Sequence, residues 1–148
     1  MLENTTVRQA TRRDLASINI LLHEWLGLRK DRQMAFTQAL RNSELIVAEK
    51  EGIVVGFIHY VMHNDIIDGG PNAFTTALYV TPKHRRKGIG TALPTRAIQD
   101  ALRKGAVGIE TSTTDPEACK LYEKHDFKQF KNEIFLEMNM APTRHRRP

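Results

Sequence analysis

The segment from residue 78 to residue 90 restricts the fold of this chain more than any other, because an apolar run passes through a basic loop and two glycines into a helical pattern. It reads Leu78-Tyr79-Val80-Thr81-Pro82-Lys83-His84-Arg85-Arg86-Lys87-Gly88-Ile89-Gly90. The first N–H groups of a helix have no partner within the helix, and the helix dipole adds positive charge there. Glycines let the backbone approach a bound group closely. The segment therefore predicts an anion-binding site where a strand passes into a helix.

Two other phosphate-binding motifs do not fit this segment. A P-loop requires Gly-Lys followed by Ser or Thr, and the chain has no such combination. The dinucleotide-binding fingerprint requires a third glycine where Leu93 stands. On its own, the loop is compatible with a solvated basic turn as well as with an anion site.

The hydrophobic pattern of the whole chain predicts an α+β fold. Strand patterns occupy residues 5–8, 45–49, 53–61, 73–80, 107–113, 127–130 and 133–140. Helical patterns occupy residues 11–27, 31–41, 88–104 and 116–125, and a loop rich in Asp, Gly and Pro spans 64–72. The order is β-α-α-β-β-β-α-β-α-β-β, and the unit at 73–113 implies one right-handed parallel crossover in a largely antiparallel sheet. We expect a mixed central β-sheet with helices on both faces.

Three residues set expectations for particular helix positions. The Thr11 hydroxyl and the Asp14 carboxylate have the spacing of a capping box at the start of the first helix. Pro94 lies early in the helix that follows the glycines, so we expect a local irregularity near Gly90.

The composition is that of an ordinary globular protein. The 148 residues are 41% hydrophobic and 26% charged, with a net charge of +5. We expect a single domain at 1–140 and a flexible basic tail at 141–148. The only cysteine is Cys119, which excludes an intrachain disulfide and a cysteine metal cluster. The N-terminus lacks the pattern of a secretory signal and no apolar run could span a bilayer, so we expect a cytoplasmic protein.

Two separated motifs resemble the GNAT N-acetyltransferase superfamily. The first is its Gln/Arg-x-x-Gly-x-Gly/Ala signature, met here by Arg85, Gly88 and Gly90 after a strand that ends in Val80 and Pro82. The second is a downstream run that reads Asp115-Pro116-Glu117-Ala118-Cys119-Lys120-Leu121-Tyr122-Glu123-Lys124-His125-Asp126-Phe127. The resemblance covers roughly residues 73–127, and the predicted element order agrees with a GNAT-like fold.

The resemblance implies that acetyl-CoA is the cosubstrate and that no metal is needed. The acetyl-CoA would bind where two neighbouring strands splay apart, and Tyr122 would protonate the departing thiolate. The residues implied in acetyl-CoA binding are Leu78, Tyr79, Val80, Arg85, Arg86, Lys87, Gly88, Ile89, Gly90, Thr91 and Asp115. The role of Tyr122 also makes chemical sense, because a phenol with a pKa of roughly 10 carries its proton at neutral pH.

Two positions depart from the family pattern. Asp126 replaces the usual Gly before Phe127, although Asp tolerates left-handed backbone geometry better than most residues. Asp115 stands where the family often has Asn, and a carboxylate cannot donate a hydrogen bond to CoA as an amide can.

The acceptor is predicted to be a primary amine, with a small amine favoured slightly over a protein because Asp65 and Asp68 would attract a cation. Residues 25–32 are a candidate acceptor region, and His59 and His63 are polar positions that would touch the acceptor. Two other functions stay open: a non-catalytic acyl-CoA-binding or sensing module, and, ranked last, a basic nucleic-acid-binding protein. Neither a membrane partner nor nucleic acid is expected, and a homodimer is an open alternative to a monomer.

Overall fold

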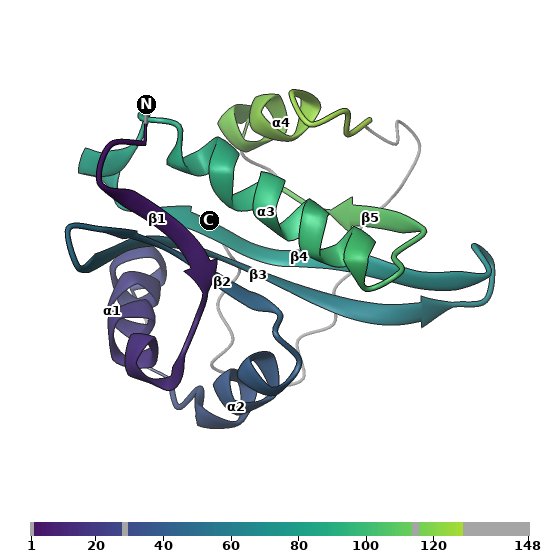
Figure 1. The fold of residues 1–148 in the computed structure, drawn as a ribbon, viewed down its shortest axis with the longest axis horizontal. Helices are drawn as coiled ribbons and strands as arrows, with labels where there is room; N and C mark the ends of the chain where they lie inside the picture. Colours follow the sequence, from purple (N-terminus) through teal and green to yellow (C-terminus); the bar gives the residue numbers. More distant parts are fainter. Residues whose placement is uncertain (1, 28–29, 114–115, 129–148) are drawn as a thin grey trace. The chain divides into compact units, whose positions relative to one another are not determined.

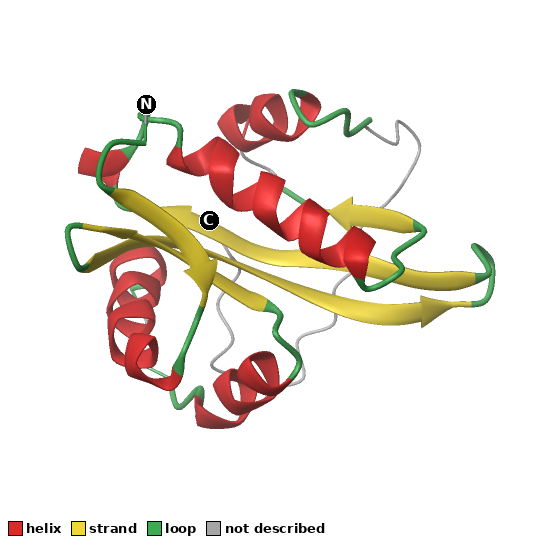
Figure 2. Cartoon of the chain, in the orientation of Figure 1, coloured by secondary structure: helices red, strands yellow, loops and turns green. Residues whose placement is uncertain are grey.

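A computed structural model describes residues 2–27, 30–113 and 116–128 of the chain (Figures 1 and 2). It divides into two compact units, one that ends at Ser112 and one that begins at Thr113. The strands of the first unit are β1 Thr5–Gln9, β2 Leu45–Lys50, β3 Ile53–Asp65, β4 Gly70–Val80 and β5 Gly108–Thr111. Its helices are α1 Leu15–Leu26, α2 Gln33–Arg41 and α3 Ile89–Arg103, with short 3-10 turns at Arg12–Asp14 and Pro82–His84. The described helix of the second unit is α4 Pro116–Glu123.

The strands form one mixed sheet in the order β1-β2-β3-β4-β5. The first three pairings are antiparallel, and β4 and β5 pair in parallel. Helix α3 supplies the crossover between the parallel strands, as the length of a βαβ connection requires. The predicted element order and the α+β fold class are confirmed as far as α4.

Each face of the sheet buries its own hydrophobic cluster. Helix α3 covers one face of the sheet (Figure 1). Its residues Ile89 and Leu93 pack there with Ile58. Residues of α1, such as Ile18, pack with Phe57 and Tyr79 on the other face. Successive side chains of a strand point to opposite faces of the sheet, so Phe57 and Ile58 of β3 belong to different clusters. Complete burial of one Leu or Ile side chain contributes about 1.5–3 kcal/mol.

The start of α1 is held by a network that the sequence predicted only in part. The Thr11 N–H donates to the Asp14 carboxylate at 2.7 Å, as expected of a capping box. The same carboxylate receives two hydrogen bonds from Arg8 on β1, at 2.7 and 2.9 Å, and Arg8 also pairs with Glu49. The hydrogen bonds from Arg8 are the main reason that the pKa of Asp14 falls from 3.8 to about 2.

Replacing Asp14 by Asn should lower the free energy of unfolding by about 2 kcal/mol at pH 7, because Arg8 loses a charge-assisted partner. The folded-state pKa of Asp14 is depressed, so its contribution is complete above pH 3.8 and is lost as the pH falls towards 2. Urea titrations at pH 7, 4 and 2.5 should show a smaller loss of stability on acidification in Asp14→Asn than in the wild type. Glu3→Gln, at an exposed position, is the control and should follow the wild type. An unchanged acid response in Asp14→Asn would contradict the assignment.

The prediction of a loop over residues 64–72 is wrong for most of that range. β3 runs to Asp65 and β4 begins at Gly70, with Asp65 opposite Gly70 and Asn64 opposite Pro71. The connecting turn is short because the Asp65 carboxylate accepts the Ile67 N–H at 2.8 Å and Gly69 adopts a φ of 77°. Cross-strand pairing therefore outweighs the turn propensity of the Gly70-Pro71-Asn72 sequence.

Helix α3 continues without interruption through Pro94. The irregularity expected near Gly90 is therefore not seen, although Pro94 has no N–H to offer the Gly90 carbonyl. Glycines with left-handed backbones bound the helix at both ends: Gly88 has a φ of 88° and Gly105 a φ of 89°.

Some predicted features fall outside the described residues. These are Asp115, most of the strand at 127–130, the strand at 133–140 and the tail at 141–148. Phe127 and Lys128 are described and are not in a strand. The single-domain boundary at residue 140 stays a prediction. Within the described part of the chain, no helix is long and apolar enough to cross a membrane.

Candidate active site

The parallel strands β4 and β5 separate halfway along β4. Their pairing runs from Asn72 opposite Gly108 to Thr75 opposite Thr111, where β5 ends. β4 continues to Val80. Among the described residues, 76–80 therefore have no β5 partner on this side of β4, which is the open edge of the strand.

A β-bulge lies at the same place. His59 of β3 faces Ala77, but Tyr60 faces Thr75, so Thr76 is an extra residue in β4. Beyond the bulge, the Thr81 N–H donates to the Val55 carbonyl at 2.9 Å. Because successive backbone groups alternate in direction, those of Leu78 and Val80 point away from β3 and towards the open edge. The side chains of Tyr79 and Val80 are buried in the two hydrophobic clusters, so these two residues can meet a ligand only through their backbone.

The loop between β4 and α3 is shaped by local contacts. Pro82–His84 form a 3-10 turn, and the Thr81 hydroxyl lies 2.8 Å from His84 Nδ1. Arg86 and Gly88 both have positive φ, 62° and 88°, which turns the chain into α3. Gly88 is the N-cap and has no side chain to bond the first N–H groups of the helix. The sequence predicts that these N–H groups and the preceding residues 81–88, the anion loop, bind an anion.

The loop is electrostatically positive. Lys83, Arg85, Arg86 and Lys87 are all exposed. Burial and then the nearby charges of Lys87, Lys50 and Lys83 lower the pKa of His84. The positive charges of the loop disfavour a further positive charge on the imidazole of His84.

Arg85 is directed back to the end of β4. Its Nε donates to the Val80 carbonyl at 2.8 Å, and its guanidinium carbon lies 5.5 Å from the centroid of the Tyr79 ring. The Tyr79 ring also stacks on Trp25 of α1, with centroids 5.3 Å apart and an angle of 12°. Arg85 therefore braces the strand end, and Trp25 is anchored by this stack. Nothing in the spacing of the sequence signals the Trp25–Tyr79–Arg85 stack.

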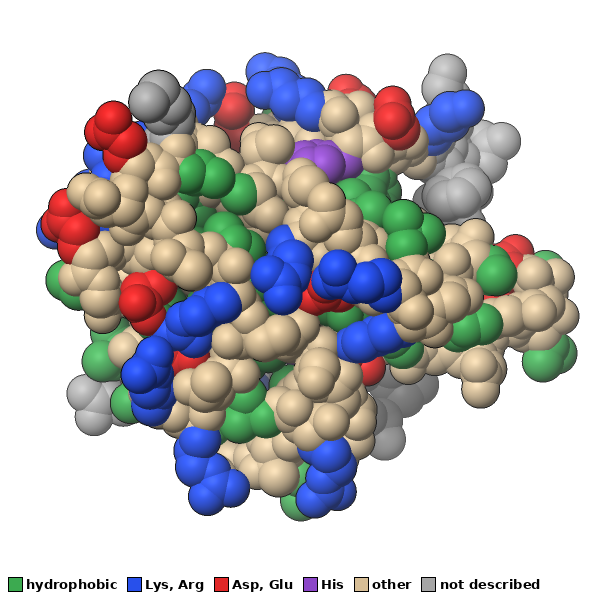
Figure 3. Space-filling model, viewed as in Figure 1, with side chains coloured by type: hydrophobic (Ala, Val, Ile, Leu, Met, Phe, Trp, Pro, Cys, Tyr) green, Lys and Arg blue, Asp and Glu red, His purple; other side chains and the backbone are tan. Residues whose placement is uncertain are grey.

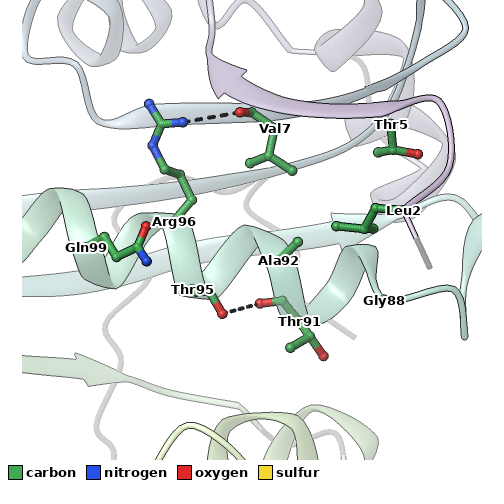
Figure 4. A pocket seen from close by; sticks show the side chains of 9 residues that line it. All are labelled: Leu2, Thr5, Val7, Gly88, Thr91, Ala92, Thr95, Arg96 and Gln99. Atoms are coloured by element: carbon green, nitrogen blue, oxygen red, sulfur yellow. Dashed lines mark hydrogen bonds between the residues drawn. The ribbon is translucent and has the colours of Figure 1, made fainter.

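A shallow groove of about 620 Å³ lies between β1 and the first half of α3 (Figure 4). Leu2, Thr5 and Val7 line one side, and Gly88, Thr91, Ala92, Thr95, Arg96 and Gln99 line the other. Arg96 donates to the Val7 carbonyl at 3.2 Å across the groove (Figure 4). The groove borders the anion loop only at Gly88, so it is distinct from the open edge of β4.

The second unit contains the predicted general acid. Tyr122 lies on α4 with 6% of its surface exposed, and its ring lies 5.2 Å from that of Phe127. Asp126 has a φ of 65°, which confirms that Asp adopts the left-handed turn for which the family uses Gly. Asp115 lies outside the described residues.

Asp65 and Asp68 shape the hairpin turn. Asp65 accepts the N–H groups of Ile67 and Asp68, and Asp68 accepts from the Asn72 amide at 2.7 Å. They lie at the start of β4, roughly 25 Å along the strand from Leu78 at 3.3 Å per residue. Their distance from the open edge of β4 therefore does not support the prediction that they attract the acceptor.

Basic side chains are spread over the face shown in Figure 3, with acidic groups among them. Arg96 and Arg103 both pair with Asp100, and Arg8 pairs with Asp14 and Glu49. These three arginines are therefore neutralised within the fold. In the described part of the chain, no group of three or more His, Cys, Asp or Glu residues could hold a metal ion.

Comparison with known proteins identifies the family. The model of the GNAT acetyltransferase family matches residues 13–127. Among solved structures, a transcriptional regulator from Bacillus halodurans C-125 superposes with a TM-score of 0.79 at 24% identity, over 92% of this chain and 99% of that chain. The aminoglycoside N-acetyltransferase AAC(6')-Iy, in complex with a bisubstrate analogue of CoA and acetylneamine, has a TM-score of 0.77 at 21% identity, over 91% and 98%. A predicted acetyltransferase with acetyl-CoA from Clostridium acetobutylicum has a TM-score of 0.74 at 18% identity, over 95% and 99%.

No curated protein matches the chain significantly. The structural neighbours are less than 25% identical, and they support the fold. The family match runs from Arg13 to Phe127, which is well over half of the chain. This chain therefore belongs to the GNAT acetyltransferase family.

Proposed function

We propose that the chain is an N-acetyltransferase that transfers the acetyl group of acetyl-CoA to a primary amine. One observation carries the proposal: β4 leaves β5 at Thr75 and runs directly into a loop that starts a glycine-capped helix. An open strand edge can hydrogen-bond an extended pantetheine arm, and a helix start with a basic loop suits a pyrophosphate. Structural neighbours with CoA or acetyl-CoA bound support the same donor.

The donor site is assigned residue by residue. The backbone groups of Leu78 and Val80, on either side of Tyr79, would hold the pantetheine arm and polarise the thioester carbonyl. The backbone at Gly88, Ile89, Gly90 and Thr91 would bind the pyrophosphate, with Arg86 and Lys87 adding charge. Arg85 would act through its bond to Val80, and Asp115 is retained as a proposed contact.

The reaction would proceed by direct attack. The amine nitrogen adds to the thioester carbonyl, and the tetrahedral intermediate collapses with loss of the CoA thiolate. Tyr122 would donate its phenolic proton to that sulfur. Positioning and carbonyl polarisation would supply most of the rate enhancement.

A small amine is the proposed acceptor. Aminoglycoside acetyltransferases are among the fold neighbours, which favours a small acceptor over a protein. The Trp25 end of α1 is a proposed part of the acceptor region, because its ring stacks on β4 beside the open edge. One domain over 1–140 and a cytoplasmic location remain part of the proposal.

Calorimetric titration with acetyl-CoA tests the donor, with ADP as the comparison ligand. Saturable binding of acetyl-CoA that is clearly tighter than that of ADP is expected, because ADP has the pyrophosphate but no pantetheine arm. An acceptor screen with kanamycin, spermidine and a lysine peptide, read by release of free thiol, then tests transfer. Absence of acetyl-CoA binding would refute the proposal, whereas binding without transfer to any amine would favour an acyl-CoA-sensing module.

A further inference from the structure

His59 and Thr76 form a side-chain pair where β4 leaves β5. His59 Nδ1 lies 2.5 Å from Thr76 Oγ1, and the Thr76 hydroxyl can also donate to the His59 carbonyl oxygen at 3.3 Å, so Nδ1 is the nearer of two acceptors for its one proton. Thr76 is the bulged residue of β4, and Thr75 before it is the last residue paired with β5. The bulge, the loss of pairing and the histidine contact thus coincide at one residue.

The pair lies on the face of the sheet opposite the anion loop. Phe57 of β3 packs in the cluster with α1, and His59 is two residues further along the same strand, so it projects from the same face. Its cross-strand partner Ala77 packs against that cluster as well. The anion loop instead leads into α3, whose Ile89 and Leu93 pack on the other face. A donor held by the loop would therefore reach the open edge from the α3 face, which leaves the α1 face to the amine.

We propose that Thr76 and His59 form a proton relay for the attacking amine, in which Thr76 contacts the amine and His59 holds the proton. This inference rests on the proposed acetyl transfer. A primary amine is mostly protonated at neutral pH and must lose a proton to become and remain a nucleophile. Imidazole is the side chain most often used as a general base near neutral pH.

The proton and electron balance of the step is complete. A bond forms between the amine nitrogen and the acetyl carbon, and the carbon–sulfur bond breaks as the intermediate collapses. The ammonium first loses one proton to solvent, and the neutral amine then attacks. As the N–C bond forms, the nitrogen releases a second proton to Thr76 Oγ1 while the hydroxyl proton passes to His59 Nδ1. The thiolate takes the proton of Tyr122, and the imidazolium then returns its proton to solvent or to the phenolate.

Few titratable groups lie on the elements around His59. β4 carries Tyr79 and no charged residue, and α1 carries His23 and Glu24. Arg41 ends α2 and Arg32 precedes that helix. Glu44, which precedes β2, is buried and accepts the Met62 N–H at 3.0 Å. His63 lies on the same strand and the same face as His59 and is predicted to touch the acceptor, so the exposed His23 of α1 is the control.

The relay requires one tautomer of His59, which gives a test that is independent of turnover. With Thr76 donating to Nδ1, the neutral imidazole must carry its proton on Nε2. Two-dimensional ¹⁵N–¹H spectra of the imidazole nitrogens, assigned with His59→Gln, should show this tautomer above pH 8. A proton on Nδ1 would overturn the relay, even if the enzyme transfers acetyl groups.

The kinetic test uses four variants with kanamycin and spermidine as acceptors. His59→Gln and Thr76→Val should lower kcat about 100-fold, and Thr76→Ser should restore it to within about threefold. His23→Gln, at an exposed position of α1 with no role in the proposed site, should match the wild type. The acidic limb of the kcat/KM profile should change in His59→Gln and persist in His23→Gln. The Kd of acetyl-CoA should stay within twofold of the wild type in all four.

The outcomes separate this inference from the proposed function. Wild-type transfer with an unchanged acidic limb in His59→Gln would overturn the relay and leave the acetyltransferase proposal intact. No transfer by the wild type to either amine would count against the proposed function, and the tautomer would still decide whether Thr76 donates to His59. Equal losses in Thr76→Ser and Thr76→Val would show that Thr76 acts only through the geometry of the bulge, which also overturns the relay.

Discussion

Replacing Gly88 by Ala should raise the Kd of acetyl-CoA at least tenfold, while the protein stays folded. Gly88 has a φ of 88°, which disfavours a residue with a Cβ by about 1–2 kcal/mol. The added Cβ would meet only Leu2, at 3.6 Å, which is ordinary contact. The strain can be relieved only by a change in the loop, and this change would move the N–H groups that are proposed to hold the pyrophosphate.

Gly105→Ala is the matched control for this variant. Gly105 has a φ of 89° just beyond the other end of α3, and a Cβ there would meet nothing within 4 Å. Both variants should therefore lose about the same stability and shift the Tm by a few degrees. Only Gly88→Ala should weaken acetyl-CoA binding in calorimetric titrations.

A truncated donor sharpens the comparison. The acetyl thioester of N-acetylcysteamine carries the thioester and the end of the pantetheine arm but no pyrophosphate. Its turnover should be nearly the same in Gly88→Ala and in the wild type. If Gly105→Ala weakens acetyl-CoA binding as much as Gly88→Ala does, then a general weakening of α3 explains the loss and the loop is not the pyrophosphate site.

The sequence predicted most of the elements because their signals are local. Left-handed glycines, the Thr11–Asp14 spacing and the helical repeat of Leu15, Ile18 and Leu22 depend on near neighbours in the chain. The anion site was predicted for the same reason: a strand end, a loop and a helix start lie within 13 consecutive residues, 78–90.

The features that were missed depend on register between distant segments. The bulge at Thr76 exists because His59 faces Ala77 while Tyr60 faces Thr75, and no local pattern in either strand encodes this shift. The Arg8–Asp14 pair and the Trp25–Tyr79–Arg85 stack likewise join separate elements. The hairpin was predicted too short because the turn residues Gly70 and Pro71 are held in β4 by pairing with β3.

Tyr122→Phe should lower kcat about 100-fold and leave the Kd of acetyl-CoA unchanged. The phenol is proposed to protonate the thiolate of CoA as the tetrahedral intermediate collapses, and loss of a general acid typically costs 100-fold or more. The aromatic ring remains, so its contact with Phe127 should be kept. Steady-state release of CoA and calorimetric titration measure the two quantities.

The other two tyrosines of the chain provide controls. Tyr60 accepts a hydrogen bond from Lys104 at 2.8 Å, and burial raises its pKa to about 12. Tyr60→Phe should therefore cost about 1 kcal/mol of stability with little change in kcat. Tyr79→Phe keeps the ring that stacks on Trp25 and should also retain near-normal turnover.

The leaving group decides whether the lost activity reflects proton donation. A thiol with a much lower pKa than CoA, such as a nitrothiophenol, leaves as a stable thiolate and needs no general acid. Tyr122→Phe should thus approach wild-type rates with the acetyl ester of that thiol. A missing proton donor slows only the reaction with the poor leaving group, whereas a defect in geometry slows both reactions. An equal loss of rate with the activated and the natural donor would therefore mean that Tyr122 has a packing role.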